Sequence, residues 1–430
     1  MKRFFALLVI TCFVLPLFAG CTQDAPEEST KEETTLEPSD ETTAPAEETT
    51  AEVIEEVKSD FEIYQSNSIT PSACNYALKS TDGQPVHRTF RGVYKIQQFG
   101  ELEYKFYFSN NVDSTFSNGS HSYRAMPTES YKIISAKVGT SSKMTGMGKV
   151  DNQKELTFGG NTERDVAAQE TFWSDAVTIN VPDGHYLVFE WTLEYTLIAA
   201  TNSEDSVCFL LDDSKGSMVI TTSAPMPALI GAKRENALRV AFIGDSITMG
   251  IGAGTRNHKF WAAQIAELAG TEISFWNLGL GYARADDAAN SPSWLEKAKN
   301  NDVIVICFGV NDINSGPYHF TGQRSADQII ADINTIATTC KEAGCEVILF
   351  STPPYTYSNS TKIEVWRELT EKIKALAETS GYDFFDFAAI LGSESNPATP
   401  AYGGHPNEAG CKAVADAFMA SGLLEKYLNK

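Results

Sequence analysis

Ser246, Asn311 and His405 are the residues whose chemical types could together carry out the hydrolysis of an ester. A serine hydroxyl is a weak nucleophile unless a neighbouring base removes its proton. Histidine suits that task because its unperturbed pKa of about 6.5 lies close to working pH. The tetrahedral intermediate then carries an oxyanion that needs preorganised donors, and backbone N–H groups together with the amide of Asn311 could supply them. These residue types therefore predict a serine hydrolase.

The elements that must position these residues follow an alternating pattern of strands and helices. Ser246 comes after an apolar, β-branched run at residues 238–243, which predicts a buried strand. In open α/β folds the chemistry lies at the carboxyl edge of the sheet, where such a loop leaves its strand. We therefore predict a three-layer α/β/α domain over residues 233–430, with a parallel five-stranded sheet. The predicted strands are 238–243, 273–276, 303–308, 347–351 and 382–387, and the predicted helices are 260–268, 325–343, 362–379 and one after Pro406.

Four short motifs occur in this region, at or near the ends of predicted elements. They are Gly244-Asp245-Ser246, Asn277-Leu278-Gly279-Leu280-Gly281, Gly309-Val310-Asn311-Asp312 and His405-Pro406-Asn407. Through these motifs the chain from Asn236 to its end resembles the SGNH (GDSL-like) hydrolase family. The resemblance implies an α/β hydrolase in which Ser246 is the nucleophile and His405 is the general base.

The resemblance also implies an oxyanion hole, made by the N–H of Ser246, the N–H of a glycine and the side-chain amide of Asn311. The second motif of the family often has two residues between its glycines, whereas only Leu280 separates Gly279 from Gly281 here. We favour Gly281 as the donor, with Gly279 as the alternative.

The family usually has an aspartate three residues before the histidine, and Tyr402 stands at that position here. That acid fixes the histidine tautomer, and its loss can cost about 10⁴-fold in turnover where nothing replaces it. A backbone carbonyl near Tyr402 could accept the ring N–H and give a Ser–His dyad, or activity could be weak or lost. We favour the dyad because some carbohydrate esterases with a similar two-domain layout work in this way. A remote acid is the alternative, and the candidates are Glu394, Asp383 and Asp386.

Three further polar residues near the motifs have simpler interpretations. We expect Asp245 to be a turn or helix-cap residue, because aspartate is favoured at both kinds of position. Asp312 is expected to organise its own loop. His258 is the histidine nearest to Ser246 in sequence, but it opens a predicted helix and is expected on the surface.

Residues 61–232 have a different sequence pattern, which predicts an all-β sandwich domain. Short runs rich in aromatic and β-branched residues are separated by Gly, Asn, Asp and Ser. Trp173, Trp191 and Tyr195 could line a platform for sugars, but we favour the core, where aromatic residues of such domains usually lie. The predicted strands include 92–96, 102–108, 131–138, 176–181 and 186–193.

The N-terminus predicts export and anchoring. Lys2-Arg3 precedes an apolar run and then Ala19-Gly20-Cys21, which resembles a bacterial lipoprotein signal over residues 1–20 with Cys21 as the lipidated residue. Residues 22–60 carry 14 acidic and two basic residues. Such a segment buries too little apolar area to fold, so we predict a disordered linker over residues 21–60. The expected location is the extracellular face of a bacterial cell membrane, or the medium if the protein is secreted.

Charge and cysteine content exclude several classes of function. The formal net charge of −22 argues against a nucleic-acid partner, which would need a basic footprint. The cysteines lack paired C-x-x-C spacing, so a metal site is not expected. No cofactor is expected either. Cys307 lies in a strand-like run and is expected in the core. Cys340 and Cys345 could form a disulfide in an oxidising compartment.

Together these features predict a surface-anchored serine esterase that removes acyl groups, above all acetyl groups, from carbohydrate. The β-sandwich could contribute substrate contacts. A glycan-binding lipoprotein whose hydrolase domain has degenerated is the alternative from another class, motivated by the missing acid. An acyltransferase on the same scaffold is a third reading.

Overall fold

The computed structural model describes residues 58–74, 76–114, 116–117, 121–122, 128–202, 209–235, 238–314, 322–393, 396–397, 400–401 and 404–428. The predicted signal, Cys21 and most of the acidic segment lie outside these residues, as do Glu394 and Tyr402.

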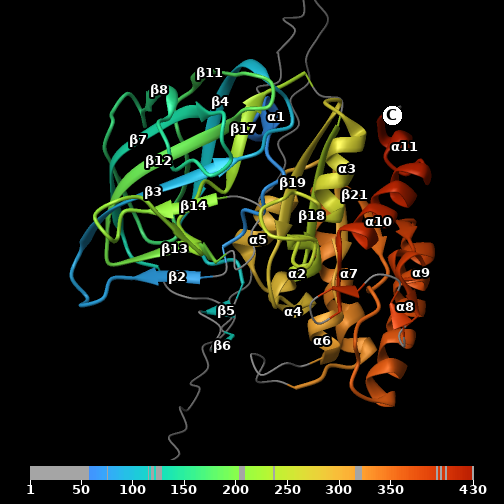
Figure 1. The fold of residues 1–430 in the computed structure, drawn as a ribbon. Coiled ribbons are helices and arrows are strands. Elements are labelled where there is room, and N and C mark those ends of the chain that lie inside the picture. The colour runs from blue at the N-terminus through green and yellow to red at the C-terminus, as the bar shows by residue number, and fades with distance from the viewer. Residues whose placement is uncertain are drawn as a thin grey trace, which may run out of the picture. The chain divides into compact units, whose positions relative to one another are not determined.

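A parallel five-stranded sheet forms the centre of the C-terminal half, as predicted (Figure 1). Its strand order is β19-β18-β20-β21-β22, so the strand that leads to Ser246 lies second from one edge. The pairings between neighbouring strands are all parallel. The strands are β18 (Leu238–Gly244), β19 (Ile273–Gly279), β20 (Val303–Cys307), β21 (Glu346–Phe350) and β22 (Asp383–Phe385).

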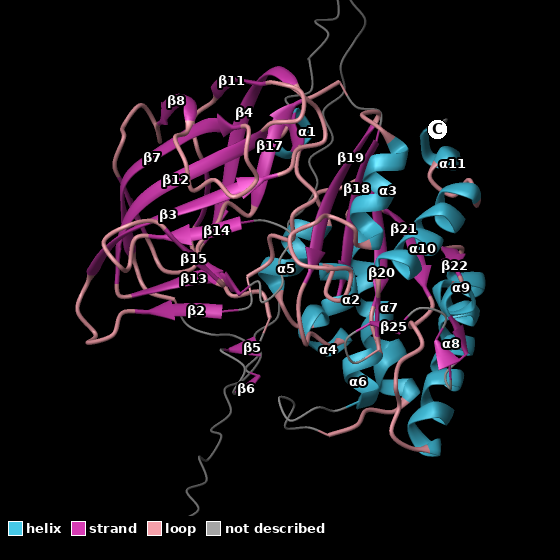
Figure 2. Ribbon diagram, in the orientation of Figure 1, coloured by secondary structure: helices cyan, strands magenta, loops and turns pink. Residues whose placement is uncertain are grey.

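Helices cover both faces of this sheet, which explains why its strands are continuously apolar (Figure 2). Successive residues of a strand point to opposite faces. Ala241 and Ile243 pack in one apolar cluster with helices α5, α7 and α8, whereas Val240 and Phe242 pack in another with α3 and α10. The three-layer prediction is therefore confirmed. These helices are α3 (Trp261–Ala269), α5 (Pro292–Ala298), α7 (Ala326–Glu342), α8 (Ser360–Ser380) and α10 (Glu408–Ala420).

Helix ends follow local capping chemistry. Ser325 and Gln328 form a capping box at the start of α7, and the side chain of Asn359 accepts a hydrogen bond from Lys362 N at the start of α8. Gly381 ends α8 in the left-handed conformation. The short helices were not predicted; they are α1 (Asp60–Ile63), α2 (Ser246–Met249), α4 (Ala285–Ala289), α6 (Val310–Asn314), α9 (Phe387–Leu391) and α11 (Glu425–Leu428).

The N-terminal half, which we call the β half (residues 58–233), contains two larger antiparallel sheets and a smaller one. The first joins β1 (Tyr64–Ser66), β17 (Leu229–Lys233), β4 (Gly100–Ser109), β10 (Thr171–Trp173) and β11 (Val177–Val181). The second joins β15 (Val219–Thr221), β14 (Phe209–Asp212), β3 (Val86–Tyr94), β12 (Tyr186–Tyr195), β7 (Tyr131–Ser141), β8 (Asp151–Leu156) and β9 (Arg164–Val166). The third joins β16 (Ser223–Ala224), β13 (Leu197–Asn202) and β2 (Tyr76–Lys79), and β5 (Phe116–Ser117) pairs with β6 (His121–Ser122).

One aromatic core fills the space between the two larger sheets. Phe106 and Phe108 from β4 pack with Phe189 and Trp191 from β12. Trp191 and Tyr195 are each 2% exposed, so the prediction that they belong to the core is confirmed. Trp173 packs at the junction with the C-terminal half, where its ring centroid lies 4.9 Å from that of Phe61 and 5.3 Å from that of Tyr107.

The cysteine side chains in the described ranges are buried and unbridged. Cys307 lies in β20 and is 1% exposed, as expected of a core residue. Cys340 and Cys345 are separate thiols, and the thiol of Cys345 donates to Asn301 O at 2.9 Å. Within the described part of the chain, no helix has the length and apolar run that a bilayer crossing needs, and no metal-binding group of acidic, His or Cys side chains is found.

Candidate active site

The register of the parallel sheet brings three of the four motifs to one edge. Gly244 at the end of β18 lies opposite Gly279 of β19 and Cys307 of β20. Ser246 and Gly281 each follow two residues after these paired glycines, and Asn311 follows four residues after Cys307. The three candidate residues therefore leave neighbouring strands at the carboxyl edge, where the sequence placed them.

Ser246 is the first residue of α2 and contacts the candidate base. Its Oγ lies 2.8 Å from Nε2 of His405. In that arrangement Nε2 accepts the hydroxyl proton, and the ring proton of the neutral tautomer lies on Nδ1. Ser246 is half-buried, whereas His405 is 9% exposed. The geometry matches that of a serine hydroxyl beside its general base.

His405 lies on a short strand outside the main sheet. It belongs to β26 (His405–Pro406), which pairs with β25 (Pro400–Ala401). Gly252 packs beneath it, since a Cβ on this glycine would lie 2.5 Å from the Cβ of His405. The ring of Tyr355 packs edge-on, with its centroid 5.7 Å from that of the imidazole. Neither residue was predicted to belong to the site. The glycine-rich run around Gly252 was a signal for left-handed backbone, and the φ of Gly252 is +95°.

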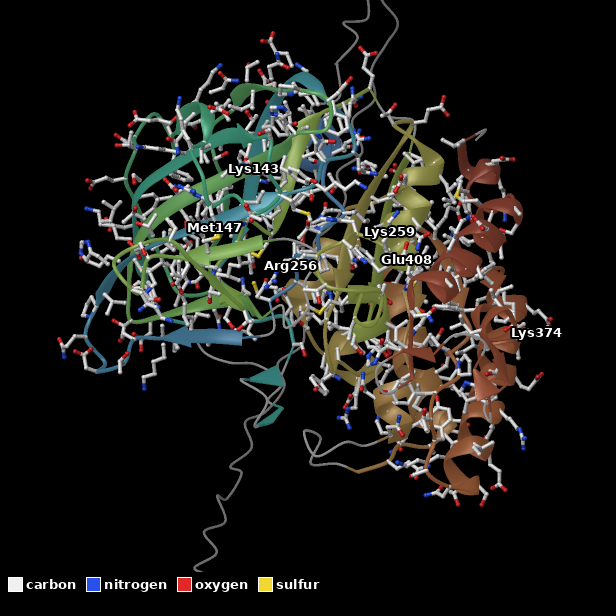
Figure 3. All side chains as sticks on the ribbon, in the orientation of Figure 1. Lys143, Met147, Arg256, Lys259, Lys374 and Glu408 are labelled. Atoms are coloured by element: carbon white, nitrogen blue, oxygen red, sulfur yellow. The ribbon has the colours of Figure 1, made fainter. Side chains whose placement is uncertain are left out.

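The N-terminal ends of helices α3 and α10 contact each other close to the segment that follows His405. Figure 3 labels Lys259 and Glu408, which lie close together where α3 and α10 begin. The side-chain amide of Gln264 in α3 donates to the carbonyls of Lys259 and Glu408, at 2.5 and 3.4 Å. The side chain of Asn407 caps α10 by accepting from Gly410 N at 3.0 Å. The segment that follows His405 is therefore tied to the segment that follows Ser246.

The structure distinguishes the two candidate oxyanion glycines. The N–H of Gly279 donates to Oδ1 of Asn277 at 2.8 Å and is therefore occupied. In the described ranges, no acceptor takes the N–H of Gly281 or that of Ser246, which lies in the first turn of α2. Gly279 is needed for packing, because a Cβ there would lie 2.3 Å from Met249 N. Gly281 is the glycine of the pair with an available donor.

Asn311 and Asp312 tie the third motif to the second. The Nδ2 of Asn311 donates to Ala283 O at 3.0 Å, which leaves the second amide hydrogen for an oxyanion. Asp312 is fully buried and accepts from Ala285 N at 3.1 Å and from Arg324 at 2.9 Å. Asp312 therefore organises its loop, as expected.

The two buried acids beside the motifs have raised pKa values. Burial raises the pKa of Asp245 to about 7, and the charge of Asp312 adds to the shift. Burial also raises the pKa of Asp312 to about 6, against the opposing effect of Arg324. Asp245 caps α2 by accepting from Ile247 N at 2.9 Å, which agrees with its expected role.

Two of the acids considered as partners of His405 are engaged elsewhere. Asp383 accepts hydrogen bonds from Lys426 Nζ at 2.8 Å and from the hydroxyl of Tyr427. Asp386 caps α9 by accepting from Ala389 N at 3.1 Å, and it also accepts from Ser351 Oγ. The third candidate, Glu394, and the carbonyl near Tyr402 lie outside the described residues.

The expectation for His258 was wrong. The residue is 2% exposed and precedes α3 in a loop, with a φ of +54°. Burial lowers its pKa to about 3, and nearby Lys95 adds to the effect. It was expected on the surface as the residue that opens a helix, whereas it lies in the loop before α3, which begins at Trp261.

Comparison with known proteins identifies the region that contains these motifs. Residues 242–413 match the GDSL-like lipase/acylhydrolase family. An acetylxylan esterase from Xylanibacter ruminicola is 26% identical over 216 residues, which are 45% of this chain and 44% of that protein. This chain thus matches less than half the length of that relative.

Solved structures with less than 25% sequence identity to this chain also match part of it. A member of the lipolytic protein G-D-S-L family from Veillonella parvula is 20% identical, with a TM-score of 0.36 over 42% of this chain and 96% of that one. A catalytic mutant of Axe2, an acetylxylan esterase from Geobacillus stearothermophilus, is 22% identical, with a TM-score of 0.37 over 43% and 94%. On the family match and the four motifs, residues 242–413 form a GDSL-like lipase/acylhydrolase domain.

Proposed function

We propose that the protein is a serine esterase that removes acetyl groups from carbohydrate. The observation that carries the proposal is the 2.8 Å contact between Ser246 Oγ and His405 Nε2 at the carboxyl edge of the sheet. The available N–H groups of Ser246 and Gly281 and the amide of Asn311 leave neighbouring strands at the same edge. A nucleophile, a base and oxyanion donors are the parts that acyl transfer requires.

The reaction proceeds in two halves. As Ser246 Oγ attacks the ester carbonyl carbon, His405 Nε2 takes the hydroxyl proton, and the carbonyl oxygen becomes an oxyanion held by Gly281 and Asn311. Collapse of the intermediate breaks the bond to the sugar oxygen, which leaves with the proton from His405. Water then attacks the acyl-serine and gives a proton to His405. Collapse of this second intermediate breaks the bond to Ser246 Oγ, which takes that proton back from His405, and the acid is released. No metal or cofactor has a step in this scheme.

The choice of an acetylated carbohydrate as substrate is supported by the similarity to an acetylxylan esterase. Export and anchoring at Cys21 would place such an enzyme outside the cell, where polysaccharides are encountered. The basic start, the apolar run and the cysteine after Ala19-Gly20 support this location.

We further propose that His405 and Ser246 work as a dyad. Asp383 and Asp386 are engaged with other partners, which supports a backbone carbonyl as the acceptor of the imidazole N–H. Glu394 is the competing candidate. Glu394→Gln should leave kcat within about threefold of wild type if a carbonyl orients the ring. A fall of about 10⁴-fold would instead assign Glu394 as the acid of a triad.

The test of the esterase proposal is the hydrolysis of acetylated xylo-oligosaccharide and of 4-nitrophenyl acetate by the full chain. We expect Ser246→Ala to lower kcat by about 10⁴- to 10⁶-fold. Ser214→Ala is the control, because this exposed hydroxyl donates to Asp212 in the β half. Undiminished hydrolysis by Ser246→Ala would overturn the proposal. Glycan binding without hydrolysis in the wild type would identify a degenerate enzyme, and acetyl transfer to sugar that outpaces hydrolysis would identify a transferase.

A further inference from the structure

Asn277 is a fully buried amide that joins three segments at the candidate site. Its Nδ2 donates to Thr248 O in helix α2 at 3.0 Å, and its Oδ1 accepts from Gly279 N at 2.8 Å. Its backbone oxygen accepts from Ser72 N of the β half at 3.3 Å. One residue therefore contacts the helix that presents Ser246, the loop that follows Gly279 and a segment more than 200 positions away in sequence.

The β half covers the edge of the sheet that carries this residue. Strand β19 is the edge strand next to β18, and an edge strand exposes backbone groups that need partners. Phe275 N donates to Oε1 of Gln97 at 3.2 Å. The indole N–H of Trp276 reaches Ser72 Oγ and Ala228 O, both at 2.9 Å. The β half thus supplies the partners that a sixth strand would otherwise have supplied.

The β half also contacts helix α5, which in turn contacts the backbone between Asn277 and Gly279. Asp113 of the β half accepts from Lys297 Nζ at 2.5 Å and from Ser293 Oγ at 2.7 Å. The side chains of Lys297 and Asp113 are both fully buried. In the same helix, the indole N–H of Trp294 donates to Leu278 O at 2.9 Å.

A buried ion pair contributes little net stability, because desolvation offsets the attraction between the charges. Its effect here is on geometry, since either charge would be unpaired if α5 moved relative to the β half. The backbone on both sides of Asn277 is thus fixed, by Trp276 on one side and by Leu278 on the other.

We propose that Asn277 is a positioning residue for the Ser246 centre, and that the β half holds it in place. The amide ties α2 to the glycine loop, so the attacking oxygen and the N–H of Gly281 keep a fixed spacing. By occupying the N–H of Gly279, Asn277 also leaves Gly281 as the glycine donor to the oxyanion. This inference rests on the proposed esterase function and assigns part of its geometry to the β half.

The test compares Asn277→Ala with Asn110→Ala in the full chain. Asn110 is 1% exposed and lies in the β half, where its amide donates to Glu129 O and Ala167 O and accepts from Ala199 N. Both changes therefore remove a buried amide with backbone partners. We expect Asn277→Ala to lower kcat by about 10- to 100-fold with KM within about threefold, because misplacement on the scale of 1 Å costs about that much. Asn110→Ala should lower Tm comparably and keep kcat.

Asn277→Asp gives a readout that a purely structural role would not change. A protonated carboxyl can donate to Thr248 O as the amide does, whereas the carboxylate cannot. The ratio of its kcat to that of wild type should therefore be highest at the lowest working pH and fall as pH rises. Trp276→Phe, which removes the N–H bonded to Ser72 and Ala228, should lower kcat severalfold and tests the contribution of the β half.

Wild-type kcat in Asn277→Ala, a pH-independent ratio for Asn277→Asp, or equal kcat losses in Asn277→Ala and Asn110→Ala would each overturn the inference. If Asn277→Ala does not fold, Asn277→Asp and Trp276→Phe decide the matter. The rate at which a fluorophosphonate labels Ser246 separates this inference from the esterase proposal. Slower labelling in the Asn277 variants would support the positioning role even if no ester is hydrolysed, and unchanged labelling would overturn it.

Discussion

Ser246 and His405 meet at one hydrogen bond, but the two sides of the site are built differently. Ser246, Gly281 and Asn311 follow adjacent strands of one sheet, whose register fixes them relative to one another. His405 belongs to a two-residue strand outside that sheet and is held by packing against Gly252 and Tyr355. The difference teaches that the nucleophile and its donors depend on sheet register, whereas the base depends on contacts between loops.

The largest effect should come from removing the base. We expect His405→Ala to lower kcat by about 10⁴- to 10⁶-fold, because Ser246 then has no group to accept its proton. The double variant with Ser246→Ala should be no slower than either single variant, since the two residues act as a unit. Steady-state hydrolysis of 4-nitrophenyl acetate measures this. His87→Ala is the control, because that exposed histidine pairs with Glu194 in the β half. A double variant that is much slower than both single variants would show that Ser246 and His405 do not act as a unit.

The second-largest effect should come from a change among the residues that the sheet register positions, with the base left intact. Asn311→Ala should lower kcat by about 100- to 1,000-fold with little change in KM, because an oxyanion donor acts mainly in the transition state. Asn314→Ala is the control from the same helix, since its side chain faces Lys362. Equal kcat values for the two variants would show that Asn311 only ties its loop to Ala283.

A smaller effect should come from the packing beneath the base. In Gly252→Ala the new Cβ would lie 2.5 Å from His405 Cβ, at a φ of +95°. Gly254→Ala has the matching strain, with a φ of +97°, but its Cβ would meet the side chain of Asn257. Both variants should lose stability, and we expect only Gly252→Ala to lose about 10- to 100-fold in kcat. Thermal unfolding and kinetics on the same samples check this, and similar kcat losses in both would refute it.

The smallest effect concerns stability at the nucleophile helix. The pKa of Asp245 rises from 3.8 to about 7 on folding, so the folded state binds more protons than the unfolded state between these values. The contribution of Asp245 to stability should therefore fall as pH rises from about 4 to 7. In the Asp245→Asn variant the new amide oxygen would still cap α2, but the side chain would not titrate. We expect the Tm of wild type relative to that of the variant to fall by about 2–5 °C across this window, and a constant difference would contradict the shift.

The same comparison explains which parts could be predicted from sequence. The apolar runs before Ser246 and Gly309 predicted their strands because both faces of a parallel sheet are buried, so the pattern is local. The contacts of Asn277 with Thr248 and Ser72, and of Lys297 with Asp113, could not be predicted because they join segments that are far apart in the chain. His258 was misplaced because its burial depends on packing around the loop before α3, which helical periodicity does not report.

The covered edge of β19 also bears on how the domain can be studied. A fragment that begins at Leu238 would contain the family motifs but would leave Phe275 N, Asn277 O and the indole of Trp276 without their partners. An apolar strand edge of this kind is a template for pairing with another chain. We expect such a fragment to self-associate. Its low solubility would therefore appear before any defect in catalysis. The two halves are thus best regarded as one unit of expression.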